Sequence, residues 1–275
     1  MVRGNIRRAG VRIFDGLQLG LVIVILLAPI AWMIASAFKQ RTEVAAYPPH
    51  FLFTPTLDNF VELFVRTDFF ANTLNSLIVA GGSTVLGLVL AVPAAFAMSW
   101  HRMTWPATAT LFARMAPGTL FLLPWLVMFT TLGLVGSHLV LILTHAVITL
   151  PVAIWVLLPY FDGLPREVIE SAEIDGCRQH QTLLRIALPM VMPGVVVAAI
   201  LCFVFSWNYF LFALVLSGFD SKTAIVASFN FIGEGVTNWG ALMAAATVIA
   251  LPPLVLTLLI QRHLVGGLSA GAVKG

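Results

Sequence analysis

Long uncharged stretches of apolar residues alternate with short polar connections along the whole chain. A bilayer core about 30 Å thick needs roughly 20 apolar helical residues to cross it. Six stretches reach that length, at 16–38, 71–99, 106–133, 138–160, 191–217 and 239–261. Because backbone groups in lipid must pair within the chain, uninterrupted runs of this length indicate helices rather than the strands of a barrel. We therefore predict an all-α integral membrane protein with six transmembrane helices.

Composition leads to the same class and limits the number of domains. Of the 275 residues, 60% are hydrophobic and 10% are charged, whereas soluble domains carry about 25% charged residues. The longest polar connections, 39–70 and 161–190, are shorter than the roughly 50 residues of a small folded domain. We expect a single membrane domain over 1–275. The net charge of +3 is not gathered into a basic patch with aromatic residues, so nucleic acid is not an expected partner.

The distribution of positive charge predicts the orientation. With the N-terminus in the cytosol, the inner side carries ten basic residues and the outer side four, which satisfies the positive-inside rule. The inner set is Arg3, Arg7, Arg8, Arg12, Arg102, Arg166, Arg178, Arg185, Arg262 and Lys274, and the outer set is Lys39, Arg41, Arg66 and Lys222. Both termini are then cytoplasmic. The first apolar run exceeds the 7–15 residues typical of a signal peptide, so we expect a retained anchor.

Motifs of the common catalytic classes are absent from the sequence. There is no phosphate loop, no H-E-x-x-H zinc motif and no G-x-S-x-G nucleophile motif. Cys177 and Cys202 have no metal-binding spacing. His138 and His145 lie seven residues apart on the fourth predicted span and could share a face as metal ligands or as a proton relay. We favour the alternative, ordinary interfacial and packing histidines. The chain is therefore predicted to be no enzyme and to bind no metal or cofactor.

The cytoplasmic connection at 161–190 has the pattern of two short helices joined by a turn. Pro165 suits the first turn of a helix, and Gly176 allows that helix to end in a turn. A second short helix is predicted from Arg178 to about Ile186, with Pro189 stopping it. Val168, Ile169 and Ala172 form an apolar stripe on the first helix. The prediction is an elbow at the membrane surface, which is either a solvated loop or a docking element.

The same elbow carries a recognisable motif. The residues Glu170-Ser171-Ala172-Glu173-Ile174-Asp175-Gly176, then nine residues, then Ile186-Ala187-Leu188-Pro189 resemble the E-A-A-x-x-D-G-x9-I-x-L-P signature of permease subunits of binding-protein-dependent ABC importers. Ser171 departs from the usual alanine, which exchanges one small residue for another. The positions that match are Glu170, Ala172, Asp175, Gly176, Ile186, Leu188 and Pro189.

A second stretch narrows the resemblance to carbohydrate importers. The run from Phe205 to Leu214 contains Trp207-Asn208 and Phe210-Leu211-Phe212-Ala213-Leu214, and it is similar to the W-N-x-F-L-F-A-L stretch of their permeases. Tyr209 stands where an acidic residue is common. The resemblance covers nearly the whole chain, and the group includes permeases for maltose, trehalose, polyols and glycerol phosphate.

The resemblance implies both a function and an assembly. The chain would be a non-catalytic permease that moves a sugar, polyol or glycerol derivative across the cytoplasmic membrane of a prokaryote, embedded in lipid. It would pair with a second homologous permease, a dimer of ATP-binding subunits that hold ATP and Mg²⁺, and an external solute-binding protein. The elbow would be the coupling helix, with Glu170 facing a basic group of the ATPase and Gly176 making the turn.

Polar side chains within the predicted spans are candidates for the solute path. These are Asn72, Asn75, Arg114, Trp207 and Asn208, because amides match hydroxyl groups and an indole can stack on a sugar ring. The alternative for each amide or indole is a hydrogen bond between helices. Arg114 has two alternatives, lining a wet path or extending to the cytosolic interface.

A stand-alone secondary carrier driven by an ion gradient is the rival interpretation. Such a carrier needs ionisable groups near the middle of the membrane, and Arg114 is the only formal charge in the six predicted spans. The elbow motif favours the ABC importer.

Overall fold

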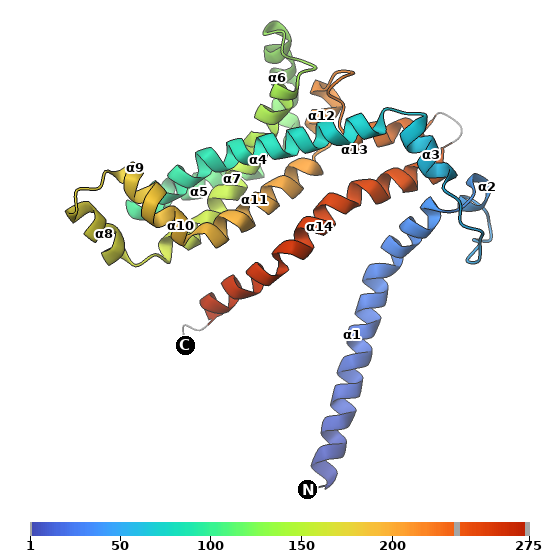
Figure 1. Ribbon diagram of the computed structural model, residues 1–275, viewed down its shortest axis with the longest axis horizontal. Helices are drawn as coiled ribbons and strands as arrows, with labels where there is room; N and C mark the ends of the chain where they lie inside the picture. The colour runs from blue at the N-terminus through green and yellow to red at the C-terminus, as the bar shows by residue number, and fades with distance from the viewer. Residues whose placement is uncertain (1, 234–236, 273–275) are drawn as a thin grey trace. The chain divides into compact units, whose positions relative to one another are not determined.

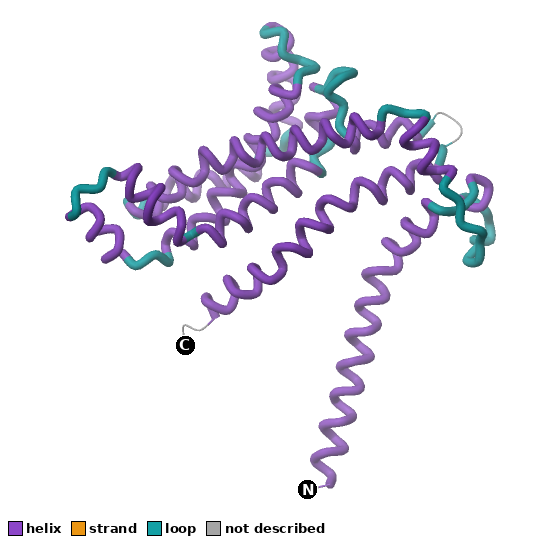
Figure 2. The backbone as a smooth tube through the Cα atoms, viewed as in Figure 1, coloured by secondary structure: helices purple, strands orange, loops and turns teal. Residues whose placement is uncertain are grey.

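The computed structural model describes the backbone of residues 2–233 and 237–272, and side chains within 15–259 except Leu111, Arg114 and residues 234–236. The described chain is built from helices and loops, with no strand in these ranges (Figure 2). Four helices are long and apolar enough to cross a membrane: α1 (Val2–Ala37), α4 (Phe69–Trp100), α7 (His138–Asp162) and α14 (Trp239–Ala272). They correspond to the first, second, fourth and sixth predicted spans.

The third predicted span is two helices rather than one. Helix α5 (Thr104–Met115) ends where Ala116 turns extended, with φ −65° and ψ 124°, and α6 (Thr119–Thr131) begins three residues later. The cause is Pro117, because the proline ring disfavours the helical conformation of the residue before it. The α6 segment is an apolar helix of 13 residues. The count of six spans therefore stays a prediction.

The fifth predicted span is also interrupted. Helix α11 (Met192–Trp207) ends at Asn208, and α12 (Leu211–Leu216) follows after a short non-helical segment. The Asn208 side-chain amide donates to the Val204 carbonyl oxygen at 2.9 Å. The Asn208 backbone N–H donates to the same carbonyl at 3.2 Å, so one residue caps this helix end through both its backbone and its side chain.

Contacts divide the chain into two compact units, residues 69–227 with 249–275, and residues 1–68 with 228–248. In the first unit α4, α7 and α11 pack pairwise against each other, and Figure 1 shows them side by side. Small buried side chains fill their interfaces: Ala91, Ala95, Ala153, Ala198 and Cys202. Small residues let helix backbones approach closely in a membrane, where packing rather than water exclusion drives association.

Polar side chains tie the same three helices together. Ser83 on α4 donates its hydroxyl to Ser206 of α11 at 2.8 Å, and His145 Nδ1 of α7 lies 2.9 Å from the same Ser206 oxygen. Thr149 donates to the Ser83 carbonyl at 3.3 Å. His138 Nε2 lies 2.8 Å from Asn75 Oδ1. The two histidines thus serve in helix packing, as the sequence favoured.

In the second unit a buried amide closes the end of α1. The unit includes the short helices α2 (Arg41–Val44) and α3 (Asp58–Val65) and the turn η2 (Phe229–Phe231). Asn59 of α3 donates to the carbonyl oxygens of Ala37 at 2.9 Å and Lys39 at 2.7 Å. Lys39 is 1% exposed, and its Nζ donates to the His50 carbonyl at 2.6 Å and lies 3.9 Å from the Trp32 ring centroid. The ammonium group is thereby compensated by a carbonyl and a ring face.

Helix α13 (Ala224–Ser228) begins in the first unit, at a buried side-chain bond to α4. The Ala224 backbone N–H donates to the Ser76 hydroxyl at 2.8 Å. The connection at 161–190 contains the helices α8 (Arg166–Ile174), α9 (Gln179–Thr182), the π-helix η1 (Leu183–Ala187) and α10 (Leu188–Met190).

Candidate functional site

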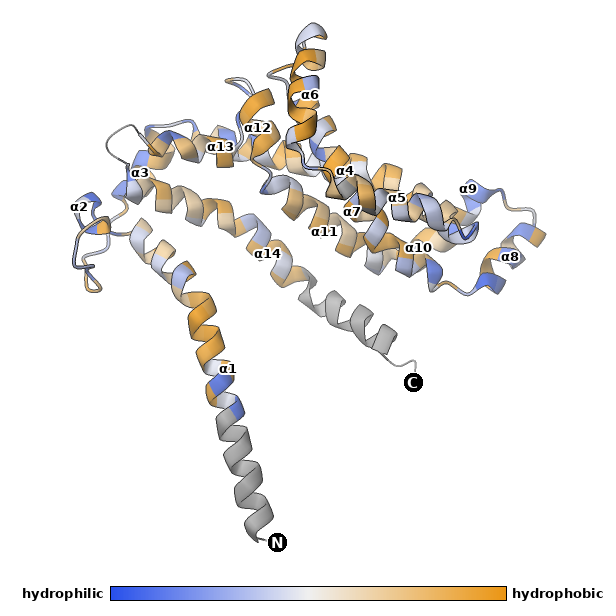
Figure 3. Ribbon diagram, turned by 180° about the vertical axis from the view of Figure 1, so that it is seen from behind, coloured by the Kyte–Doolittle hydropathy of each residue, from blue (hydrophilic) through white to orange (hydrophobic). Residues whose placement is uncertain are grey.

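The connection at 161–190 folds into the predicted elbow, at one end of α4, α7 and α11 (Figure 1). Pro165 precedes the first residue of α8, and Glu167 lies in the first turn, where a negative charge favours the helix dipole. Ile169 and Ala172 are 3% and 4% exposed. Figure 3 shows α8 and α9 as the hydrophilic end of this unit, in contrast to α6. The helix therefore buries one apolar edge and leaves a polar face open.

The turn after α8 depends on Gly176. This glycine has φ +84°, its N–H donates to the Glu173 carbonyl at 3.0 Å, and the Cys177 N–H donates to the Ala172 carbonyl at 2.9 Å. This pair of bonds is the Schellman arrangement, in which the residue with positive φ is usually glycine. The glycine thus ends α8 and directs the chain toward α9.

The motif residues on α8 divide between an open and a buried face. Glu170, Ser171, Asp175 and Gly176 are exposed, whereas Ala172 is buried. The Ser171 hydroxyl donates to the Val168 carbonyl at 3.0 Å, within its own helix. The carboxylates on this face are accessible to a partner.

The second helix of the elbow continues beyond the predicted stop at Pro189. Leu188 donates its N–H to the Leu183 carbonyl, five residues back, through the π-helical turn η1. Pro189 has no N–H to donate to this helix, which ends one residue later at Met190. The chain instead bends by 83° at Val191, between α10 and α11. Ile186 and Leu188 are half-buried, and Pro189 is exposed.

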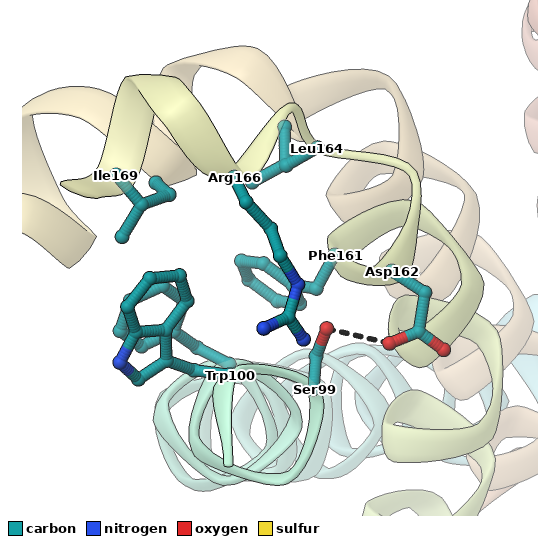
Figure 4. Close-up of a pocket in the computed structure, with 8 residues that line it drawn as sticks. Ser99, Trp100, Phe161, Asp162, Leu164, Arg166 and Ile169 are labelled. Atoms are coloured by element: carbon teal, nitrogen blue, oxygen red, sulfur yellow. Dashed lines mark hydrogen bonds between the residues drawn. The ribbon is translucent and has the colours of Figure 1, made fainter. Parts of the chain in front are cut away.

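The start of α8 is anchored to the ends of α4 and α7 by residues that the sequence did not single out (Figure 4). The Arg166 guanidinium carbon lies 5.6 Å from the Trp100 ring centroid, and the Ser99 hydroxyl donates to Asp162 Oδ1 at 2.5 Å. Figure 4 shows Arg166 directed between Trp100 and the Ser99–Asp162 pair, with Ile169 on the far side of the ring. This anchor joins three elements around a cavity of about 50 Å³. The one sign of this anchor in the sequence is Trp100, which directly follows the second predicted span.

The polar candidates for a solute path are mostly engaged within the protein. Asn75 donates to the carbonyls of Asp220 at 2.9 Å and Lys222 at 3.0 Å, besides its contact with His138. The buried Trp207 donates its indole N–H to the Ile249 carbonyl at 3.0 Å. These contacts are the packing alternative that the sequence left open.

The other three candidates differ in their surroundings. Asn72 on α4 is buried, at 9% exposed, and Asn208 is exposed beside the end of α11. The side chain of Arg114 lies outside the described residues. The structure therefore does not bring the five predicted path residues together into one described site.

An aromatic cavity of about 200 Å³ lies at the break between α5 and α6. Its rings form a continuous series: Phe121 to Trp125 at 5.5 Å, Trp125 to Phe212 at 5.0 Å and Phe212 to Tyr209 at 4.8 Å between centroids. The Tyr209 hydroxyl oxygen packs closely on Gly118, and a Cβ atom at this position would displace it. No periodic pattern in the sequence indicates this cavity, because the cavity depends on the helix break at Ala116.

Comparison with known proteins decides the family. Residues 9–269 match the family of binding-protein-dependent transport system inner membrane components. The chain belongs to this family. The permease is therefore the non-catalytic membrane subunit of an ABC transporter, and the resemblance seen in its elbow motif is confirmed.

Individual relatives cover almost the full length of the permease. It is 34% identical over 250 residues to a probable ABC transporter permease of Sinorhizobium fredii, covering 90% of each chain. It is 34% identical over 266 residues to a trehalose transport system permease of Mycobacterium tuberculosis, covering 93% of this chain and 95% of the relative. A chain of a bacterial ABC transporter for alginate import has the same fold, with a TM-score of 0.74 at 18% identity over 91% of this chain and 95% of that one. The all-α permease fold is thus confirmed.

The anchor predicts how firmly the elbow is held. Trp100→Ala removes the ring beneath Arg166, and a cation–π contact contributes about 0.5–2 kcal/mol. We expect the backbone amides of residues 167–174 to exchange hydrogen for deuterium about tenfold faster, measured by mass spectrometry. The matched control is Trp105→Ala, because Trp105 is 77% exposed and outside the anchor. Equal exchange in Trp100→Ala and the unchanged permease would contradict the anchor.

Proposed function

We propose that the permease translocates a sugar or related polyhydroxylated solute inward across the cytoplasmic membrane, driven by ATP hydrolysis on partner subunits. The observation that carries the proposal is the elbow motif on α8 within a chain of this family. The printed names of relatives, which include trehalose, alpha-glucoside and diacetylchitobiose transport permeases, support the solute class. Five of the six predicted spans contain no formal charge, which suits a neutral hydroxylated solute.

The proposed assembly follows the family description and one structural neighbour. A second homologous permease, a dimer of ATP-binding subunits carrying ATP and Mg²⁺, and an external solute-binding protein complete the transporter. The alginate transporter with a similar fold was solved with a pentasaccharide-bound periplasmic protein, which supports the last partner. The ten-to-four distribution of basic residues supports cytoplasmic termini and a cytoplasmic elbow.

In this proposal α8 is the coupling helix. Its exposed Glu170 pairs with a basic group in a cleft of the ATP-binding subunit, since a carboxylate that loses water on docking needs a charged or hydrogen-bonding partner. Ser171, Asp175 and the Gly176 turn present that face, while buried Ala172 packs inward. Ile186, Leu188 and Pro189 lead from the elbow into the bend at Val191. Movement of the ATP-binding subunits is thereby transmitted to α7 and α11.

The solute path is proposed to include the aromatic cavity at the α5–α6 break. Broken helices with free backbone groups near the middle of the membrane are common at transporter binding sites. Phe121, Trp125 and Tyr209 offer ring faces, and their apolar character suits the face of one sugar ring. The cavity of about 200 Å³ is smaller than the roughly 300–1,000 Å³ of sites for drug-sized ligands. The proposed path still includes Asn72, Arg114 and Asn208. Its walls are supported by Asn75 and Trp207, whose side chains bond to backbone carbonyls.

Coupling predicts a specific defect in Gly176→Pro. Proline fixes φ near −65° against the observed +84° and removes the N–H that bonds the Glu173 carbonyl, so the turn cannot form. In vesicles reconstituted with the complete transporter, we expect ATP-driven uptake to fall at least tenfold while ATP hydrolysis continues. Glu170→Lys, which reverses the charge of the docking face, should give the same uncoupling.

Gly176→Asn is the matched control, because asparagine tolerates the left-handed conformation better than other side chains. It should retain most of the uptake. Uptake by Gly176→Pro at the unchanged rate would contradict the role of the elbow. Uptake by the unchanged permease in vesicles without ATP and without partner subunits would favour the ion-coupled carrier instead.

The aromatic cavity predicts a change in apparent affinity. Trp125→Ala removes a ring face worth about 0.5–1.5 kcal/mol in aromatic contacts. We expect the KM for uptake by the reconstituted transporter to rise roughly fivefold, with the maximal rate within twofold. The control is Trp155→Ala, which removes a 55% exposed tryptophan of α7 outside the cavity. If both variants give the same KM as the unchanged permease, the cavity is not on the path.

A further inference from the structure

A third cavity, of about 560 Å³, opens beside the anchor where α4 ends, α5 begins and α7 ends. Arg102 and Arg166 line it, and we call it the arginine groove. The cavity is about ten times larger than the one inside the anchor and shares Ser99, Asp162 and Arg166 with it. Its size and open side distinguish it from a packing defect between helices.

The groove carries a net positive charge. Its formal charges are those of two arginines and of Asp162, whose Oδ1 accepts the Ser99 hydroxyl at 2.5 Å. Arg102 and Arg166 are exposed, and neither guanidinium has a carboxylate within 4.0 Å among the residues whose side chains are described. Two guanidinium groups without a carboxylate partner are suited to bind a phosphate group.

The backbone at Arg102 adopts a conformation that is unfavourable for a residue other than glycine. Arg102 has φ +52°, the one positive φ of a non-glycine residue in the described chain. Its N–H donates to the Ser99 carbonyl at 3.2 Å, and the Met103 N–H donates to the Met98 carbonyl at 2.8 Å. This is the same Schellman arrangement that ends α8, where glycine occupies the equivalent position. Arg102 therefore stands where glycine is favoured, and backbone strain of this kind is typical of functional positions.

The remaining walls of the groove are apolar below and polar at the rim. Met98, Ala107 and Leu158 come from segments predicted to cross the membrane, and Thr104 and Thr108 add hydroxyl groups. Met103 and Trp105 are exposed at the same helix start, 44% and 77% respectively, and tryptophan is enriched at the level of lipid headgroups. A cationic rim above an apolar wall matches the order of groups along a phospholipid.

We propose that the arginine groove binds an anionic glycerophospholipid, with its phosphate on the guanidinium groups of Arg102 and Arg166 and an acyl chain against Met98 and Leu158. Basic pockets between membrane helices on the cytoplasmic side are known to hold anionic headgroups. The proposal rests on the cytoplasmic orientation given above, and it needs no particular solute. Because Arg166 begins α8, the bound lipid contacts both the elbow and the end of α4.

The test measures lipid retained by the purified transporter complex. The complex is stripped in detergent, titrated with phosphatidylglycerol or phosphatidylcholine, and examined by native mass spectrometry. The unchanged complex should bind phosphatidylglycerol at least fivefold more tightly than phosphatidylcholine, and Arg102→Gly with Arg166→Gln together should lose roughly fivefold in affinity for each arginine removed. Arg102→Gly alone places the favoured residue in the turn and leaves the anchor intact, so its expected loss of roughly fivefold cannot come from a loosened α8. Arg185→Gln, an equal charge change on an exposed residue outside the groove, is the control.

Three outcomes would overturn the proposal. Equal affinity of the double variant and the unchanged complex would remove the arginines as ligands. Equal binding of the two lipids would remove recognition of the anionic headgroup. Displacement of phosphatidylglycerol by equimolar inorganic phosphate would assign the groove to a soluble phosphate compound rather than to lipid. None of these measurements uses ATP or uptake, so their outcome is independent of the proposed transport function.

Discussion

Every backbone polar group that lies in the bilayer must find a partner within the protein, and the arrangement of this chain follows from that constraint. Continuous helices satisfy it along α4 and α7. Where Pro117 breaks the third predicted span, the non-helical segment lies beside an aromatic cavity. Where α11 ends, the side-chain amide and the backbone N–H of Asn208 both donate to the Val204 carbonyl. Interruptions thus occur where side chains or a cavity can accommodate them, and such places are suited to solute passage.

The end of the permease that carries the elbow depends on two helix ends of the same geometry. Gly176 adopts φ +84° after α8, and Arg102 adopts φ +52° after α4. The turn after α8 uses glycine, the residue for which a positive φ has the lowest conformational energy. The elbow that follows from it is open to a partner. The second accepts strain to place a guanidinium at a groove. Between them, the Trp100–Arg166 contact joins α8 to α4, so a force applied to the elbow reaches the membrane helices through side chains as well as through the chain itself.

Hydropathy, together with the prolines and glycines that begin or end helices, predicted most of the architecture. Helix length and turn conformation can be predicted in this way because they are local properties of the sequence. The spans around α4 and α7 and the turn at Gly176 follow directly from them. The stop at Pro189 was wrong because a π-turn carries the helix past the proline. The roles of Asn75 and Trp207 required the structure, since residue type cannot tell whether an amide meets a solute or a carbonyl 145 positions away. The anchor and the cavities likewise depend on distances between elements.

The most direct test of the coupling account places a photo-crosslinking amino acid at the exposed Ser171 in the intact transporter, in its native membrane. Illumination followed by mass spectrometry of the adducts identifies what contacts α8. The account predicts an adduct with an ATP-binding subunit that carries a phosphate loop, and loss of that adduct in Gly176→Pro. Adducts confined to lipid or to other copies of the permease, in membranes that take up solute, would contradict it.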